Sequence, residues 1–308
     1  MRVIFQLKRL SAHAILLLNG RQVLLRKKEK FMSFSIITTC KSRLSHLKQV
    51  IGSWKAINPT EIIVVDVSCP DKTALWLKEH HPDVTCVSAP AEVFNLSHAR
   101  NIGAQQAKCN ILFFVDADVV LDPNMGDWIS ENYIPGTFYV RHKDTVLDGV
   151  HEAGSALCGK QAFMASHGYD DAIGGYGCED LDFYLRLQRL GVKQEAIPKI
   201  FFKSLEHSDQ VRTENYAIKD KKLSATIVRT YVALKHAALK LNDHLPELPL
   251  ADRKMLYNKV VEQLNDDFGS LAGRVITIDI TNRKWLPEPY VIKMKTQISV
   301  EIDIKAEK

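Results

Sequence analysis

Residues 111–118 read Ile111-Leu112-Phe113-Phe114-Val115-Asp116-Ala117-Asp118, so five apolar side chains run directly into two acids. A short apolar run without Gly or Pro is typical of a buried strand in a parallel sheet. Side chains two apart on a strand share a face, so Asp116 and Asp118 should emerge together at its carboxyl end, where open α/β sheets bind ligands. Two carboxylates there suit a hard divalent cation and a diphosphate. A solvated strand end that feeds a turn is the alternative interpretation.

The sequence around this run alternates between strand and helix patterns from residue 33 onward. The spacing of apolar residues predicts strands at 34–39, 61–66, 84–88 and 111–118, and helices at 43–54, 73–80 and 96–107. This rhythm predicts an α/β fold with a mostly parallel, twisted sheet and helices on both faces. The first strand leads into Thr39-Cys40-Lys41-Ser42-Arg43 rather than G-x-G-x-x-G, which argues against a dinucleotide-binding Rossmann unit.

Both ends of the chain depart from this alternation, and we predict three parts. Residues 1–32 form an N-terminal extension with a hairpin at Asn19-Gly20, since Asn-Gly favours a two-residue turn. Residues 33–212 form the catalytic domain. Residues 213–308 form an extension with two amphipathic helices, followed by segments that alternate in the two-residue period of antiparallel strands.

The composition restricts the partners and the compartment. Lys and Arg number 41 against 36 Asp and Glu, a net charge of +5, which suits a small anionic substrate but falls short of a nucleic-acid-binding surface. The apolar run at residues 14–18 is far shorter than the ~20 residues of a membrane span. The six cysteines show no C-x-x-C pair, which favours reduced thiols. We therefore expect a cytoplasmic protein, with peripheral contact at the inner face of the cell membrane as an additional possibility.

Two further segments carry candidate chemistry. Residues 174–182 place Gly174, Gly175, Tyr176 and Gly177 before Glu179 and Asp180 in the first turn of a predicted helix. Glycines allow a loop to close over a ligand, and the helix dipole favours acids in the first turn, although acidic capping of a flexible turn explains the same pattern. His207 lies in Leu205-Glu206-His207-Ser208-Asp209 and is either a metal ligand or an ordinary exposed histidine.

The order of these motifs resembles that of the GT-A glycosyltransferases, which are nucleotide-sugar enzymes with one α/β domain and a D-x-D metal site. The resemblance covers about residues 33–209. Its first half is similar to the family 2 glycosyltransferases in residues 34–43, in Val64-Val65-Asp66-Val67-Ser68 and in Ala99-Arg100-Asn101-Ile102-Gly103. Its second half is similar to β-1,4-galactosyltransferases and bacterial polysaccharide polymerases. Residues 175–182 correspond to their W-G-x-x-E-D loop, and residues 207–208 correspond to their third metal ligand. Residues 43–47 correspond to their N-R-x-x-H-L stretch.

The resemblance implies an inverting, metal-dependent transfer of a sugar from UDP-sugar to a hydroxyl of a glycan or lipid-linked glycan, in surface polysaccharide synthesis. Galactose, N-acetylgalactosamine or a related sugar would be moved. The metal is expected to be Mn²⁺, with Mg²⁺ as the alternative, held by Asp118, Asp116 and His207. Asp180 would be the general base and Glu179 would position the acceptor. The implied nucleotide-sugar contacts are Thr38, Asp66 (to the uracil imide), Arg100 or Arg43 (near the pyrophosphate), Asp116, Tyr176 and Gly177.

Two departures from the family pattern concern the donor. Tyr176 stands where the galactosyltransferases carry Trp, and Thr38-Thr39-Cys40-Lys41 replaces their proline-aromatic-arginine nucleotide loop.

Three other functions are alternative interpretations of the sequence. Residues 113–120 also fit the D-x-D-x-[TV] motif of haloacid-dehalogenase-type phosphatases, with Asp116 as nucleophile, although three strand-like runs precede the motif here. A non-catalytic nucleotide-sugar-binding module and a metal-dependent nucleotidyltransferase are the others.

Overall fold

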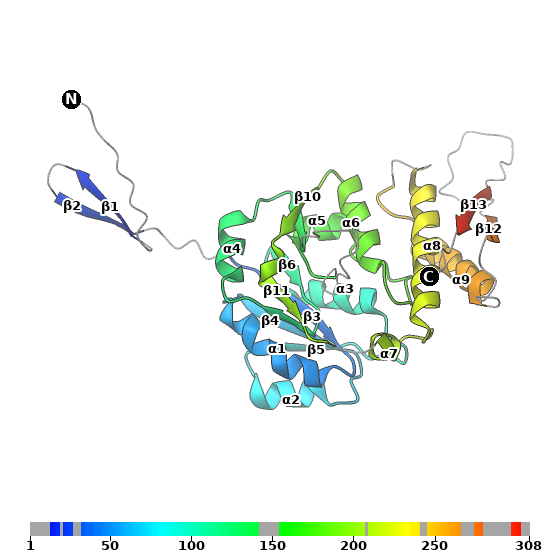
Figure 1. Ribbon diagram of the computed structural model, residues 1–308, viewed down its shortest axis with the longest axis horizontal. Helices are drawn as coiled ribbons and strands as arrows, with labels where there is room; N and C mark the ends of the chain where they lie inside the picture. The colour runs from blue at the N-terminus through cyan, green and yellow to red at the C-terminus, as the bar shows by residue number, and fades with distance from the viewer. Residues whose placement is uncertain are drawn as a thin grey trace, which may run out of the picture. The chain divides into compact units, whose positions relative to one another are not determined.

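A computed structural model describes residues 13–18, 21–26, 32–141, 154–206, 209–240, 245–265, 274–279 and 297–302 (Figure 1). The chain divides into two compact units, residues 1–32 and residues 33–308. In the first unit, β1 (His13–Leu18) and β2 (Arg21–Arg26) pair antiparallel with Leu18 opposite Arg21. This register is the one expected from a two-residue Asn-Gly connection.

The second unit is built on a mostly parallel sheet, as predicted. Its described part contains seven strands in the order β10 (Lys193–Ile197), β8 (Thr137–Arg141), β9 (Ala156–Gly159), β6 (Ile111–Phe114), β3 (Ser35–Cys40), β4 (Glu61–Asp66) and β5 (Thr85–Ser88). Strand β9 runs antiparallel to both of its neighbours, and the other paired strands are parallel. The carboxyl ends of β3, β4 and β6 therefore lie at one edge.

Helices cover both faces of this sheet (Figure 1). One face packs on α3 (Leu96–Gln106), α5 (Lys160–Ala165) and α6 (Glu179–Arg189), where apolar side chains form a continuous buried cluster. Helix α1 (Leu44–Ala56) lies against β3 and β7 (Val119–Leu121), and α2 (Thr73–His80) packs beside β5. Helix α4 (Met125–Asn132) follows β7. Asn95 caps α3, because its side chain accepts a hydrogen bond from the His98 N–H at 2.9 Å.

The structure corrects the sequence reasoning about the two acids of the D-x-D motif. Strand β6 ends at Phe114, and the chain turns before β7 (Val119–Leu121). Strand β7 pairs antiparallel with β11 (Phe202–Ser204), which follows the short 3-10 helix η1 (Lys199–Phe201) in the chain. The turn is closed by the Val119 N–H, which donates to the Asp116 carbonyl at 3.1 Å. Asp116 and Asp118 therefore share a turn after the strand rather than one face of the strand.

The C-terminal part contains α7 (Asp209–Thr213), α8 (Lys221–Lys240) and α9 (Leu250–Asn265), followed by β12 (Arg274–Asp279) and β13 (Gln297–Ile302), which pair antiparallel. The apolar stripe of α8 is buried in a cluster that includes α9 and also Ala172 and Ile173 from the loop before α6. A domain boundary at residue 212 stays a prediction. Within the described residues, no helix combines the length and the apolar composition that crossing a membrane requires.

Candidate active site

A pocket of about 300 Å³ lies where the D-x-D turn, the glycine loop and the start of α6 meet. Its volume is at the lower end of the range typical of small-molecule sites, ~300–1,000 Å³. The pocket is lined by Thr39, Lys41, Arg43, Phe94, Leu96, Asp116, Ala117, Asp118, Gly154, Tyr176, Gly177, Cys178, Glu179, Asp180, Arg212, Asn215 and Tyr216. Most of the residues predicted for the site, from motifs some 60 residues apart, thus meet in one cavity.

Arg100 joins the two acidic motifs from behind the pocket. Its Nη2 lies 2.8 Å from Asp116 Oδ1, and its Nη1 lies 3.0 Å from Glu179 Oε1. The guanidinium also lies 4.9 Å from the centre of the Tyr169 ring, within the range of a cation–π contact. Only 3% of the Arg100 side chain is exposed, so this arginine orients two carboxylates of the site and does not itself line the pocket.

Close packing at Gly154 keeps this ion pair in place. A Cβ atom at residue 154 would lie 2.7 Å from Arg100 Nη2 and 2.8 Å from Asp116 Oδ2, well inside van der Waals contact. A side chain there would displace either the guanidinium or the carboxylate. The backbone approach at Gly154 is therefore a requirement of the Arg100–Asp116 pair.

The electrostatics of the pocket favour a bound cation. Burial, and then the charge of nearby Asp118, raise the pKa of Asp116 even though Arg100 opposes them. Burial and neighbouring Asp180 likewise raise the pKa of Glu179 to about 7. Burial is the largest cause of both shifts and the neighbouring acids add to it, so a divalent cation at this position would stabilise the ionised carboxylates. The carboxylates of Asp116 and Asp118 are hard oxygen donors of the kind that Mn²⁺ and Mg²⁺ accept, so they fit such an ion.

The glycine loop is held against α8 before it enters α6. The Tyr176 N–H donates to Ser224 Oγ at 2.8 Å, and the Tyr176 ring meets the edge of Tyr216 at 6.0 Å. Gly177 has a φ of +89°, a conformation that glycine adopts without strain. The loop thereby delivers Glu179 and Asp180 to the pocket from the first turn of α6, as predicted.

Two family models match consecutive parts of the chain. Residues 35–129 match glycosyl transferase family 2, and residues 151–209 match the N-terminal domain of galactosyltransferase. The fold is similar to that of S. aureus TarS 1–349 in complex with UDP-GlcNAc, with a TM-score of 0.52 and 12% identity over 77% of this chain and 75% of that one. The chain is a glycosyltransferase of the GT-A type. This identification overturns the phosphatase alternative.

Two other solved structures resemble this glycosyltransferase less closely in fold. A mannosyltransferase from Pyrobaculum calidifontis in complex with GDP-Man and Mn²⁺ has a TM-score of 0.48 and 13% identity over 76% of this chain and 71% of that one. A mutant of Drosophila β1,4-galactosyltransferase 7 in complex with manganese, UDP-Gal and xylobiose has a TM-score of 0.44 and 16% identity over 63% and 79%. No curated protein matches the chain.

Besides Arg100, two residues predicted for the donor do not line the pocket of the glycosyltransferase. Thr38 is buried within β3, and its neighbour Thr39 lines the pocket instead. Asp66 uses both carboxylate oxygens on its own loop, accepting from the Cys69 N–H at 2.7 Å and from the Ala74 N–H at 3.0 Å. The uracil contact of Asp66 stays a prediction. Arg43 does line the pocket, where its Nη1 lies 2.7 Å from Glu214 Oε1.

The metal ligand predicted at His207 lies outside the described residues, and its role stays a prediction. The chain that leads to it is placed by the pairing of β11 with β7. The Leu205 N–H donates to the Asp118 carbonyl at 2.8 Å, which brings this segment beside the D-x-D turn.

Sequence reasoning missed two pocket residues that come from beyond residue 212, Asn215 and Tyr216. Asn215 donates through Nδ2 to the Lys41 carbonyl at 3.2 Å, and its own carbonyl accepts from the Phe94 N–H at 3.3 Å. The Tyr216 ring meets the Phe94 ring edge-on at 5.2 Å. These contacts hold Asn215 and Tyr216 in the pocket lining. Asn215 and Tyr216 belong to no sequence motif. In the sequence, Tyr216 is explained equally well as the first residue of the predicted helix that follows.

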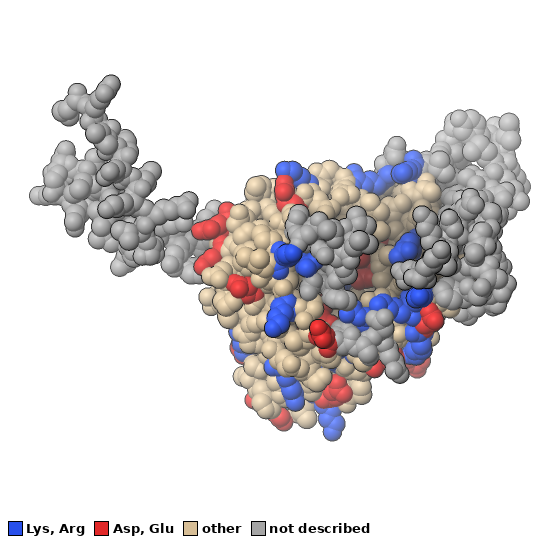
Figure 2. All heavy atoms as spheres, in the orientation of Figure 1, with Lys and Arg blue, Asp and Glu red and all other residues tan. Residues whose placement is uncertain are grey.

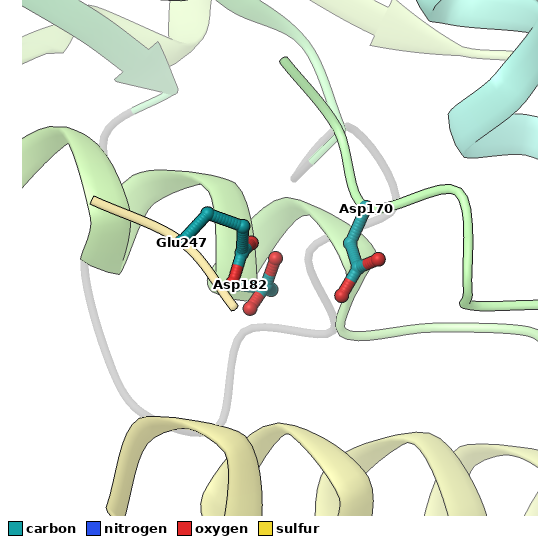
Figure 3. A group of neighbouring side chains, drawn as sticks. All are labelled: Asp170, Asp182 and Glu247. Carbon is teal, nitrogen blue, oxygen red and sulfur yellow. The ribbon is translucent and has the colours of Figure 1, made fainter. Parts of the chain in front are cut away.

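A second acidic group, Asp170, Asp182 and Glu247, is a buried ion-pair network. Figure 3 shows the three carboxylates converging, and their oxygens lie within 4.8 Å of one another, as in a metal site. Lys235 Nζ, however, lies 2.7 Å from Asp170, 2.6 Å from Asp182 and 2.9 Å from Glu247. Burial alone would raise the pKa of Asp182, but Arg186 and Lys235 hold it well below its usual range. A metal would have to displace this lysine, so the network's role is to dock α6 on α8.

Proposed function

We propose that this glycosyltransferase moves a sugar from a UDP-sugar to a hydroxyl of a glycan acceptor, with Mn²⁺ held at Asp116 and Asp118. The observation that carries the proposal is the convergence of the D-x-D turn and the Glu179–Asp180 pair on one pocket, with Arg100 bonded to both motifs. The UDP-GlcNAc bound by the similar TarS structure makes UDP-sugars the first donors to test. Galactose or N-acetylgalactosamine is the proposed sugar, and surface polysaccharide synthesis the proposed setting.

The donor half of the pocket would bind the diphosphate. Lys41, Arg43 and Arg212 line it and offer the positive side chains that phosphate oxygens require. Figure 2 shows basic and acidic side chains mixed across the visible face. A bound Mn²⁺ would act as a Lewis acid and neutralise charge that develops on the departing diphosphate.

The acceptor half of the pocket would supply the base. Asp180 is half-buried at the pocket wall, whereas Glu179 is buried and paired with Arg100. We assign proton removal to Asp180 because it is half-buried in the pocket lining, whereas Glu179 is buried and already forms an ion pair with Arg100. The acceptor oxygen bonds to the anomeric carbon as the bond to the diphosphate breaks, and Asp180 takes the hydroxyl proton. A single displacement of this kind inverts the anomeric carbon. Glu179 would orient the acceptor.

Nucleotide choice gives the first test. In the presence of Mn²⁺, we expect UDP to raise the melting temperature more than GDP, CDP or ADP, because the donor site should read the uracil imide as well as the diphosphate. A ligand at 100 times its Kd stabilises the folded state by ~2.7 kcal/mol, which thermal-shift measurements detect readily. Equal shifts for all four nucleotides would show that the site recognises the diphosphate alone.

Metal dependence gives the second test. Asp118→Ala should abolish Mn²⁺-dependent hydrolysis of UDP-sugars without unfolding the protein, because the side chain lies at the sheet edge and not in the core. Asp127→Ala is a matched control, since Asp127 is exposed on α4 and outside the pocket. Hydrolysis should be measured with added Mn²⁺ and again in EDTA. Full activity in EDTA would refute the metal site.

A further inference from the structure

Two cysteines meet beside the pocket without serving the proposed transfer. Cys40 ends β3, and Cys69 lies in the connection between β4 and α2. The Val67 N–H donates to the Cys40 carbonyl at 3.1 Å, which holds this connection against the end of β3. Cys40 Sγ lies 3.2 Å from Thr73 Oγ1, and the Cys40 and Cys69 side chains lie close enough for a hydrogen bond that shifts the pKa of each. The two sulfurs are thus direct neighbours.

The surroundings of the two sulfurs shift their pKa values in opposite directions. The hydrogen bond from Cys40 lowers the pKa of Cys69 to about 5, with further help from Thr73 and the backbone and against the effect of burial. One of those backbone donors is Ser42, whose N–H lies 3.2 Å from Cys69 Sγ. The same bond, and burial after it, raise the pKa of Cys40, so Cys40 keeps its proton. Cys69 is half-buried and Cys40 is buried.

We propose that Cys69 is a peroxide-reactive modification site and that Cys40 resolves it into a disulfide. The Cys69 sulfur attacks one oxygen of hydrogen peroxide, the O–O bond breaks, and hydroxide leaves as a sulfenic acid forms. The Cys40 sulfur then attacks the Cys69 sulfur, the S–O bond breaks, and the Cys40 proton leaves with the hydroxide as water. Two thiols and one peroxide give one disulfide and two waters. The cysteines are oxidised by two electrons, and the peroxide is reduced by two.

The position of this pair gives the disulfide a structural consequence. It would tie the loop after β3, whose Lys41 and Arg43 line the pocket, to the connection before α2. The reaction itself depends on the thiols alone. It therefore stands or falls independently of the donor and of the transfer reaction.

Cys86 provides a matched control within the same chain. It is also half-buried, but burial and the charge of Asp66 raise its pKa to about 11. At pH 7 the thiolate fraction therefore favours Cys69 by ~10⁴-fold. The weaker nucleophilicity of a low-pKa thiolate reduces this advantage by ~10²–10³-fold. A rate at least ~10-fold higher at Cys69 than at Cys86 is the expected net result.

The experiment uses the reduced full chain, an equimolar amount of hydrogen peroxide, alkylation of the remaining thiols and peptide mapping by mass spectrometry. We expect a Cys40–Cys69 cross-linked peptide that dithiothreitol reverses. The Cys86→Ser variant should give the same cross-link, and Cys69→Ser should give none, with Cys40 left free to alkylate. In Cys40→Ser, dimedone should trap a sulfenic acid at Cys69.

Two results would overturn the proposal. One is wild-type protein in which Cys69 is oxidised to sulfenic or sulfinic acid while Cys40 is still alkylated as a free thiol. The other is oxidation of Cys86 as fast as that of Cys69, since it would show that the surroundings of Cys69 do not activate it.

Discussion

Asp180→Asn should lower kcat by ~10²–10⁴-fold, the usual contribution of a general base, because the amide cannot accept the acceptor's proton. The fold should survive, since Asp180 Oδ1 accepts the Leu181 N–H at 2.8 Å and the amide oxygen of Asn can accept the same bond. The affinity for UDP with Mn²⁺ should change little, because the residue is assigned to the acceptor half of the pocket.

Steady-state transfer and calorimetric titration with UDP and Mn²⁺ check this result together. Asp127→Asn makes the same chemical change at an exposed position of α4 and should leave both measurements unchanged. If the nucleotide affinity of Asp180→Asn collapsed, Asp180 would belong to the donor half and the assignment of the base would be wrong. Unchanged kcat would exclude Asp180 as the base.

Lys235→Met should destabilise the protein by ~3–5 kcal/mol, a large part of the ~5–15 kcal/mol that stabilises a typical domain. Lys235 is fully buried and contacts the carboxylates of Asp170, Asp182 and Glu247. Methionine is similar in length, so the variant removes the charge rather than the packing. Arg186 and Arg253 then face three buried carboxylates without the lysine.

Urea denaturation at neutral pH measures this loss, with Lys222→Met as the control, since Lys222 is exposed on the same helix and should change stability by less than ~0.5 kcal/mol. A chain shortened at residue 212 extends the test. It loses Lys235, Glu247 and Arg253 and should be poorly soluble. Two results would show that the network does not hold the C-terminal helices on the catalytic domain. One is a loss of stability below ~1 kcal/mol for Lys235→Met. The other is a soluble, folded fragment of residues 1–212 with unchanged donor hydrolysis.

The central strands could be predicted from sequence because β4 and β6 are buried on both faces and are therefore almost continuously apolar. Residues 61–66 and 111–114 are strands as the pattern indicated, and Asn95 caps the helix that was expected to begin beside it. The exact end of β6 could not be predicted. Val115 is as apolar as the strand residues before it, and its N–H still donates to the Ile37 carbonyl of β3 at 3.0 Å before the chain turns between Asp116 and Val119.

The sequence by itself determined the order of strands and acids, and with it the edge of the sheet at which a cation and a diphosphate would bind. Only the tertiary structure decided which charged side chains form ion pairs and hydrogen bonds with one another. It joined Arg100 to both Asp116 and Glu179, set Lys235 among three acids, and occupied Asp66 with its own loop. The physical reason is that periodicity records which face of an element is buried. Ion pairs between residues far apart in the chain depend on how helices dock on the sheet, and no local pattern encodes that geometry.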